Sequence, residues 1–598
     1  MDSQNKNLIL ATALSFVVIL VWFILFPPPE AQPTDPNAPV ATAEGVTTPA
    51  APAAPAATPA APAQATVEAA DSNAPRLPID TPRIEGAISL QGGRIDQLAL
   101  KDYREENVPG SANVTVLSPV GSENAFYALF GWAAGAGLTP DAVPGPNTLW
   151  TVESGTNLTP DNPVTLAWDN GAGQTFRRTI SVDQDYMFSV TQSVTNTGAS
   201  AISLAPYGIL ARHGEPANAK NFFILHEGTV GMADGELTET SYGNLEDLDF
   251  NAREGTRAEV TQVAESGWIG FTDHYWMSTL IPTAGTPFKS VIKYDEARNI
   301  FQAEAVQPTQ TVAPGQTASA DTKLFSGAKE WETIRNYENA GVTKFVDSID
   351  WGWFFFLTKP IFQALHFLHG FIGNMGWSII ALTIVIKAIV FPLAYKSYAS
   401  MAKMKELQPK MEELKKAAGD DKAKVQQAMM ELYKKEKVNP ASGCLPILIQ
   451  IPIFFSLYKV IFVTLELRHA PWLGWITDLS APDPSSILNL FGLLPYATPS
   501  PDSIFAIVSL GILPILLGIS MWLQQKLNPA PTDATQAMIF AWMPWVFMFM
   551  LGSFASGLVL YWITNNTITF TQQYLIMRSH GYKPDVFGNI KNSFKRKK

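Results

Sequence analysis

The sequence lacks the residues and motifs on which many functional sites are built. Its 598 residues include one cysteine, Cys444, which excludes a disulfide-bonded scaffold. It contains no Gly-x-Ser-x-Gly, no His-Glu-x-x-His and no phosphate-binding glycine-rich loop. These absences argue against a membrane enzyme, so we expect no catalytic residues. A pI near 5.3 argues against a uniformly basic, nucleic-acid-binding protein.

Charge and apolar residues are unevenly distributed along the chain. Residues 27–350 contain 18 Lys and Arg against 39 Asp and Glu, a net charge of −21, whereas residues 351–598 contain 23 against 13, a net charge of +10. The second part also holds apolar runs that are too long for ordinary core helices. A single soluble globule is therefore excluded, and the length predicts several domains.

The first apolar run predicts a membrane anchor over residues 1–26. Leu8–Phe26 would span about 28 Å as a helix, close to the thickness of a bilayer core. A cleavable signal peptide is the alternative, but three prolines rather than an Ala-x-Ala site follow the run. Residues 27–79 are rich in Pro and Ala, with 12 prolines by residue 75, and predict an extended tether.

Residues 80–345 predict a large antiparallel β-sandwich. Gln174–Thr197 alternates apolar and polar residues on both sides of a turn, which is typical of a hairpin. Helices do not alternate with the strands, so a parallel sheet is disfavoured, and one helix near Ala328–Asn339 closes the domain. We expect no metal site and no cofactor, because the domain's histidines show no metal-ligand spacing: His213, His226 and His274.

The distribution of basic residues predicts how the second part crosses the membrane. Lys396–Lys437 carries 11 Lys and Arg, which places it in the cytoplasm. If the acidic domain is outside, only one crossing fits before this segment. Gly376–Tyr395 is then that crossing, and residues 346–375 form an amphipathic helix at the outer interface.

Three more apolar regions complete a five-helix core over residues 376–577. They are two single spans and one closely connected pair: Cys444–Val463, Ile504–Leu523 and Ala537–Met577. The fold class is therefore a polytopic α-helical membrane protein with six transmembrane helices and both termini inside. The tail at residues 578–598 holds seven basic residues, which agrees with a cytoplasmic end. The fifth span is short enough to thin the bilayer locally.

Residues 399–437 predict a cytoplasmic helical hairpin. Apolar residues recur at helical spacing with lysines on the outer faces, and this apolar stripe requires a partner such as lipid or protein. A solvated charged loop is the alternative. The first turns of the hairpin supply the expected contact residues: Met401, Lys403, Met404 and Lys405.

Lys387 is the least expected residue of the core, because it lies near the middle of a span. A mid-span lysine costs about 2.5–3.5 kcal/mol on insertion scales, so it should face water or a partner. No other span contains an acidic residue, which argues against an ion pair inside the membrane and for a wet, positively charged cavity. Thr383 lies one turn away on the same face.

Polar residues also recur along the last span. Trp562, Asn566, Thr569 and Gln573 form one stripe, and Gln450 and Ser520 lie within the third and fourth spans. These groups could join helices to one another. Together with Lys387 they predict a hydrophilic groove that is open to the cytoplasm and to lipid.

Several long stretches of the sequence resemble the YidC/Oxa/Alb family. The matching strings are SYASMAKMKELQPK at Ser397–Lys410, LYKKEKVNPASGCLPILIQIP at Leu432–Pro452, ELRHAP at Glu466–Pro471, WITDLS at Trp475–Ser480 and SGLVL at Ser556–Leu560. The resemblance implies a bacterial inner-membrane insertase that inserts and folds membrane proteins without nucleotide hydrolysis, alone or with the Sec translocon. It also implies a periplasmic β-supersandwich, and it maps groove residues onto Thr383, Lys387 and Trp562. The family usually has arginine where Lys387 stands.

The implied partners are nascent membrane proteins, Sec components and lipids, and we expect the chain to act as a monomer. The basic tail predicts weak contact with the ribosome or with anionic lipid. A solute transporter is one alternative, but it would predict inverted repeats that the sequence does not show. A membrane-anchored structural scaffold is another, and it would not need Lys387. The sequence indicates no role for the external stretch Asn489–Asp502.

Overall fold

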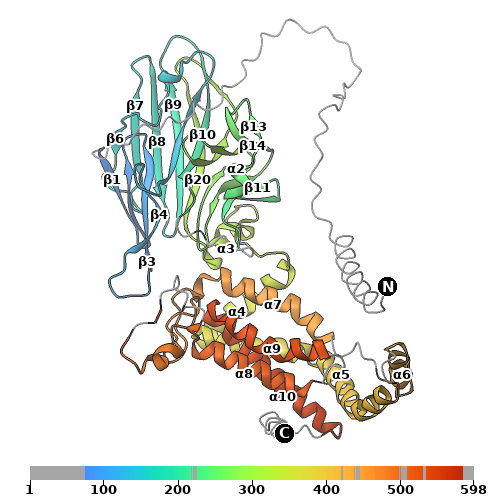
Figure 1. Ribbon diagram of the computed structural model, residues 1–598. Helices are drawn as coiled ribbons and strands as arrows, with labels where there is room; N and C mark the ends of the chain where they lie inside the picture. The colour runs from blue at the N-terminus through green and yellow to red at the C-terminus, as the bar shows by residue number, and fades with distance from the viewer. Residues whose placement is uncertain are drawn as a thin grey trace, which may run out of the picture. The chain divides into compact units, whose positions relative to one another are not determined.

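The computed structural model describes residues 74–582 except 217–218, 220–224, 419–421, 437, 439–444, 497, 500–504, 506–507 and 529–533. The expected anchor, the tether up to residue 73 and the tail beyond residue 582 lie outside the described residues. The described chain forms a β domain followed by a helical region (Figure 1).

The β domain is a sandwich of two antiparallel sheets, as the sequence predicts. In the described residues one sheet has 11 strands, in the order β1-β2-β3-β5-β10-β18-β17-β14-β13, with β4 on β3 and β19 on β10. Its strands are β1 (Arg76–Asp80), β2 (Ile84–Ser89), β3 (Arg94–Arg104), β4 (Asn113–Leu117), β5 (Phe126–Ala134), β10 (Ile202–His213), β13 (Phe250–Asn251), β14 (Thr256–Val263), β17 (Phe288–Asp295), β18 (Ile300–Val306) and β19 (Gln310–Val312).

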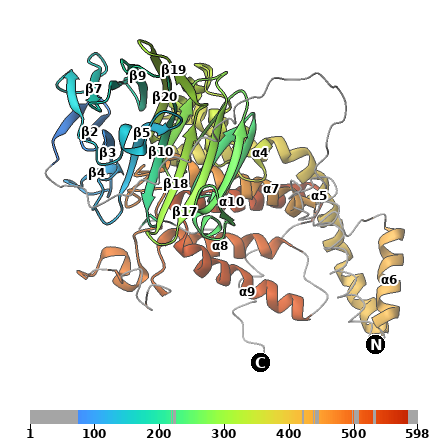
Figure 2. The ribbon, with the colours of Figure 1, turned by 90° about the horizontal axis from the view of Figure 1, so that it is seen from above.

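The second sheet has nine strands, in the order β12-β11-β15-β16-β20-β9-β8-β7-β6. Its strands are β6 (Thr151–Ser154), β7 (Val164–Asp169), β8 (Gln174–Val182), β9 (Met187–Asn196), β11 (Gly228–Ala233), β12 (Glu236–Ser241), β15 (Gly267–Thr272), β16 (Trp276–Pro282) and β20 (Thr317–Ala328). Both sheets are seen from above in Figure 2.

The predicted hairpin is confirmed at β8 and β9. The two strands pair antiparallel from Gln174 opposite Asn196 to Val182 opposite Phe188. Along β8, buried and half-buried residues alternate strictly, because successive side chains of a strand point to opposite faces. The inward residues, such as Phe176, join the apolar core between the sheets.

The β domain begins earlier than the sequence predicts. Residues 76–79, expected to end the tether, form most of β1, which pairs with β2. Leu77 and Ile79 are buried, whereas Arg76, Pro78 and Asp80 are exposed. Pro78 is compatible with this strand because β1 lies at the edge of its sheet.

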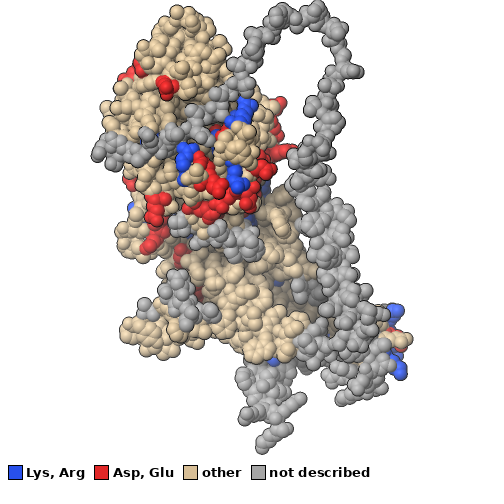
Figure 3. Space-filling model, turned by 45° about the horizontal axis from the view of Figure 1, so that its top comes forward, with Lys and Arg blue, Asp and Glu red and all other residues tan. Residues whose placement is uncertain are grey.

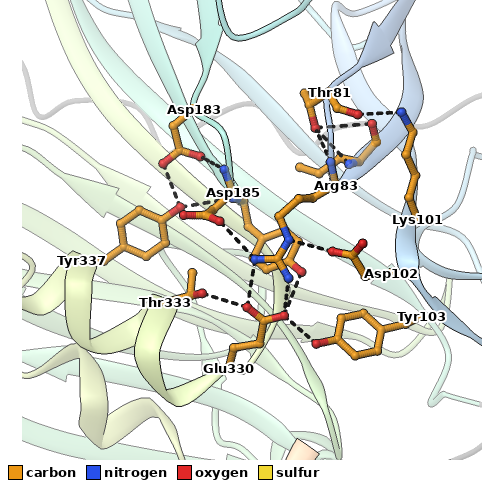
Figure 4. Close-up of polar contacts among 12 residues, drawn as sticks. Thr81, Arg83, Lys101, Asp102, Tyr103, Asp183, Asp185, Glu330, Thr333 and Tyr337 are labelled. Atoms are coloured by element: carbon orange, nitrogen blue, oxygen red, sulfur yellow. Dashed lines mark hydrogen bonds and ion pairs between the residues drawn. The ribbon is translucent and has the colours of Figure 1, made fainter. Parts of the chain in front are cut away.

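Arg83 joins three parts of the β domain in a polar cluster (Figure 4). It lies just before β2, and its guanidinium donates to Asp102 Oδ2 at 2.7 Å, to Asp185 Oδ1 at 3.0 Å and to both carboxylate oxygens of Glu330, one of them at 2.9 Å. Glu330 is the residue before α3 (Trp331–Asn339) and also accepts from Tyr103 and Thr333. The cluster therefore ties both sheets to the helix that closes the domain.

The helical region follows η2 (Phe345–Ser348). Its elements are α4 (Phe355–Ile372), α5 (Met375–Ala418), α6 (Lys422–Lys435), α7 (Leu445–Val463), η4 (Leu465–Leu467), η5 (Ile487–Gly492), α8 (Ile512–Leu527), α9 (Ala534–Met550), η7 (Leu551–Ser553) and α10 (Ser556–Ser579). The β domain adds η1 (Pro140–Ala142) and α2 (Tyr242–Glu246). In Figure 3 acidic side chains, with a few basic ones, gather on the visible face of the β domain, whereas the helices directly below are mostly uncharged and a separate group of mainly basic side chains lies at the lower right.

Helix α5 is longer than the sequence predicts. It runs for 44 residues through Pro392 and Pro409, so the expected hairpin at 399–437 begins inside one helix and not as a separate element. Residues Met375–Leu407 of this helix are long and apolar enough to cross a membrane. Shorter apolar helical stretches lie at Leu448–Val463, Ile512–Leu527 and Met538–Ser553.

Replacing Glu330 tests the polar cluster. Burial alone raises the pKa of this carboxyl, but hydrogen bonds from Arg83, Tyr103 and Thr333 hold it below its usual value of 4.5. A lowered pKa stabilises the fold above the unfolded-state pKa, and the contribution is lost as the pH falls through the folded-state value. Glu330→Gln should lower the free energy of unfolding by about 1–3 kcal/mol at neutral pH, with less difference in acid.

Pulse proteolysis of the β domain in urea, on the detergent-solubilised full chain, measures this difference. The matched control is Glu153→Gln, since Glu153 also pairs with an arginine, Arg177, but both side chains are about 40% exposed. An exposed pair contributes about 0–1 kcal/mol, so the control should change little. Equal losses in both variants would contradict a special role for the cluster.

Candidate functional site

The ammonium group of Lys387 lies among neutral oxygens contributed by two other helices. Its Nζ donates to Thr569 Oγ1 on α10 at 2.9 Å and to Gln450 Oε1 on α7 at 3.2 Å. No carboxylate among the described residues forms a salt bridge with it. Three predicted site residues from distant parts of the sequence therefore meet at one point, and the positive charge is solvated by dipoles without being neutralised.

Tyr561 extends this cluster and was not among the predicted site residues. It lies on α10, is 2% exposed, and its hydroxyl oxygen accepts from Gln450 Nε2 at 2.6 Å. Since the same amide offers its oxygen to Lys387, the two bonds fix which way Gln450 points. The sequence signal was weak, because a tyrosine in an apolar segment is common and its partner lies 111 residues away.

The remaining polar residues of the α10 stripe bond to α8 and to the residue that follows it. Asn566 Nδ2 donates to Ser520 Oγ at 3.1 Å, and Gln573 Nε2 donates to Asn528 Oδ1 at 3.0 Å. Asn566, Ser520 and Gln573 are buried. The stripe thus divides: Thr569 faces Lys387, and its neighbours join α10 to α8 as interhelical polar contacts do in membranes.

Among the described residues, Thr383 and Trp562 form no hydrogen bond with Lys387 or with one another. Thr383 is buried, and its hydroxyl donates to Ile379 O of its own helix at 2.7 Å. Trp562 packs between Phe454 of α7 and Phe547 of α9, with ring centroids 5.0 and 6.0 Å away. Trp562 is therefore part of an aromatic wall beside the polar cluster.

The predicted cytoplasmic hairpin at residues 399–437 is called the arm from here on. Its four expected contact residues differ in their surroundings. Met401 is buried against the end of α10, and Met404 packs beside it. Lys405 Nζ donates to Lys526 O at the end of α8, at 3.2 Å, whereas Lys403 is exposed. Further out, Lys410 of α5 forms an ion pair at 3.0 Å with Glu436, the residue that follows α6.

The β domain contacts the helices through polar side chains. His274 Nε2 of the β domain lies 2.7 Å from Phe462 O at the end of α7, and Lys459 of α7 forms an ion pair with Asp350, which lies between η2 and α4. A cavity of about 1040 Å³ lies at the junction, lined by residues of both regions including His274, Phe462 and Arg468, but not by Lys387.

Comparison with known proteins assigns the chain to a family. A family described as the YidC periplasmic domain matches residues 76–364, and one described as the 60Kd inner membrane protein matches residues 367–583. The membrane protein insertase YidC of Ruegeria sp. is 67% identical over 601 residues, which covers 100% of this chain and 99% of the relative. The chain belongs to the YidC family. Its β domain is accordingly periplasmic and its helical region lies in the inner membrane.

Other YidC proteins agree with this assignment. The membrane protein insertase YidC of Ruegeria pomeroyi is 66% identical over 604 residues, covering 100% of this chain and 99% of the relative. A solved structure of an active YidC insertase shares 17% identity and covers 83% of this chain and 92% of that chain, with a TM-score of 0.35. The family assignment rests on the sequence matches.

Tyr561→Phe tests whether the hydroxyl orients Gln450. Losing one hydrogen bond costs about 0.5–1.5 kcal/mol, so we expect insertion of a substrate with an acidic translocated end to slow by about 2–10-fold. The measurement is the insertion rate in proteoliposomes. Tyr574→Phe is the matched control, because Tyr574 is on the same helix and stacks on Phe570. Similar rates in both variants would rule out the orienting bond.

Proposed function

We propose that this insertase moves the polar end of a substrate across the membrane by attracting it to Lys387. The curated relatives are membrane protein insertases, and at 62–67% identity over the whole chain this protein is an insertase of the inner membrane and not an enzyme. Nascent membrane proteins are its substrates.

The observation that carries the proposal is the neutral surrounding of Lys387. A cation held by amide and hydroxyl oxygens keeps its charge available to an incoming anion, whereas an ion-paired lysine would already be neutralised. At an effective dielectric constant near 20, opposite charges 4 Å apart attract by about 4 kcal/mol. That attraction offsets part of the cost of bringing a carboxylate of the substrate into the apolar layer.

We infer a hydrophilic groove around this cluster, open to the cytoplasm and to lipid, with Thr383, Lys387, Gln450, Ser520, Trp562, Asn566, Thr569 and Gln573 as its residues. The substrate's apolar part would enter lipid beside α7 and α9. Helix α9 has 17 residues and spans about 25 Å, less than the bilayer core of about 30 Å, so thinning of the bilayer would shorten the polar path. The protein would lower a barrier and consume nothing.

The proposed topology has six spans with both termini in the cytoplasm. The periplasmic β domain places the residues before α4 outside, and the basic arm on α5 and α6 then lies inside. We propose the following domain limits: a membrane anchor to residue 26, a tether, the β domain to residue 345, an interfacial helix to residue 375, the five-helix core to residue 577 and a basic tail.

Partners beyond the substrate belong to the proposal as well. Met401, Lys403, Met404 and Lys405 lie on the cytoplasmic arm, where a nascent chain or anionic lipid would arrive first. We propose the Sec translocon as a partner because the family resemblance implies it, weak contact with the ribosome because the tail is basic, and action as a monomer.

The charge of position 387 provides the test. Lys387→Ala should slow insertion of substrates with acidic translocated ends about tenfold or more, a factor equal to about 1.4 kcal/mol, whereas Lys387→Arg should retain activity. Insertion is measured with purified protein in proteoliposomes without nucleotide. A substrate with an uncharged translocated end serves as the control and should be affected less. Equal activity of Lys387→Ala, Lys387→Arg and the parent chain would contradict electrostatic attraction of the substrate by Lys387.

A further inference from the structure

An exposed apolar loop, residues Ile487–Tyr496, projects between α7 and α8 and has no part in the proposed mechanism. From 484 to 501 the sequence contains no charged residue. The largest exposed fractions in the loop are 83% for Leu493, 54% for Tyr496 and 49% for Leu490. In Figure 1 the chain between α7 and α8 projects in orange to the left of the helices. An apolar surface of this kind in a folded protein marks an interaction site.

The base of the loop is fixed to the start of α8. Asp483 Oδ2 accepts from Leu513 N at 2.8 Å, and Ser485 Oγ accepts from Ile512 N at 3.0 Å. These contacts satisfy backbone N–H groups of the first helical turn, which have no partner within the helix. Asp483 and Ser485 therefore fix the base of the loop to the first turn of α8.

The loop is held in a conformation that exposes its apolar residues. Leu490 and Phe491 have φ of 52° and 58°, a left-handed conformation that is unfavourable for residues with a Cβ. Phe491 N donates to Ser486 O at 2.7 Å, and Gly492 N donates to Asn489 Oδ1 at 3.0 Å. Such strain persists only where the surroundings impose it, so the outward direction of these side chains is built into the fold.

The loop lies on the periplasmic side of the helices. The segment that leads to it contacts the β domain: Arg468 donates to Arg104 O at 2.6 Å, and Asn107 Nδ2 donates to Thr477 O at 3.0 Å. Helix α8 itself has 16 residues and spans about 24 Å, which is less than the bilayer core of about 30 Å. Apolar surface beside its periplasmic end would cover the remaining depth.

We propose that the apolar loop inserts into the outer leaflet, with Leu490, Phe491 and Leu493 at the boundary between headgroups and acyl chains. An uncharged segment with exposed Leu, Phe and Tyr residues is typical of the interface, where apolar side chains enter lipid and a tyrosine reaches the polar layer. The loop thereby gives the insertase a second contact with the outer leaflet, at α8. This inference is independent of the role of Lys387.

Quenching of a probe at the loop tests the proposal. The full chain carries Cys444→Ser and Leu493→Cys, a fluorescent label on the new thiol, and is reconstituted in vesicles of phosphatidylethanolamine and phosphatidylglycerol. Lipids with a spin label high on the acyl chain should quench this probe about twofold or more, as expected for burial of about 5–10 Å, and aqueous iodide should not. Leu490→Cys is the second probe position if Leu493→Cys fails to fold.

The matched control is Phe250→Cys on β13, which is apolar, 69% exposed and on the β domain. Its probe should be quenched by iodide and not by spin-labelled lipid. Iodide quenching at the loop equal to that at the control would place the loop in water and overturn the proposal. A loop probe that neither quencher reaches would show that protein covers it, and would overturn the proposal equally. Insertion activity of each labelled chain is recorded separately, so failure here does not bear on Lys387.

Discussion

The helical region depends on a single constraint, a positive charge held inside an apolar layer without a counter-ion among the described residues. Lys387 is solvated by Gln450 and Thr569, and Gln450 is in turn oriented by Tyr561. A charge in lipid is costly, so the helices that supply these oxygens must stay in register for the site to exist. The bonds from Asn566 and Gln573 of α10 to Ser520 and Asn528 maintain that register along the same stripe.

The β domain relies on the opposite arrangement, in which charges are paired. Arg83 is surrounded by three carboxylates, and Glu330 connects this cluster to α3 immediately before the helical region begins. Pairing gives the Arg83 cluster a structural role, whereas Lys387, which has no ion-pair partner among the described residues, is proposed to attract a substrate. The acidic β domain and the basic arm thus differ in sign because one is periplasmic and the other is proposed to be cytoplasmic.

Patterns within one segment could be read from the sequence, whereas contacts between segments could not. The β8–β9 hairpin followed from strict alternation, since one face of the strands is buried. The sequence also singled out Lys387, Gln450 and Thr569 as polar residues within apolar spans, and the structure places the three in contact. It did not identify Tyr561, nor that Thr383 would bond within its own helix, because helical spacing fixes a face but not the neighbour opposite that face. The continuity of α5 from the membrane span into the hairpin was missed because the basic residues that begin at Lys396 mark the end of a span but not the end of a helix.

The most direct test of the central claim is an exchange of charge between protein and substrate. Lys387→Glu is reconstituted with two substrates that differ only in whether the translocated end carries aspartate or lysine, and insertion is measured without a membrane potential. The account predicts that the variant loses the aspartate substrate and gains the lysine substrate relative to the parent chain. Equal insertion of both substrates by both proteins would show that the charge at position 387 does not guide the polar end.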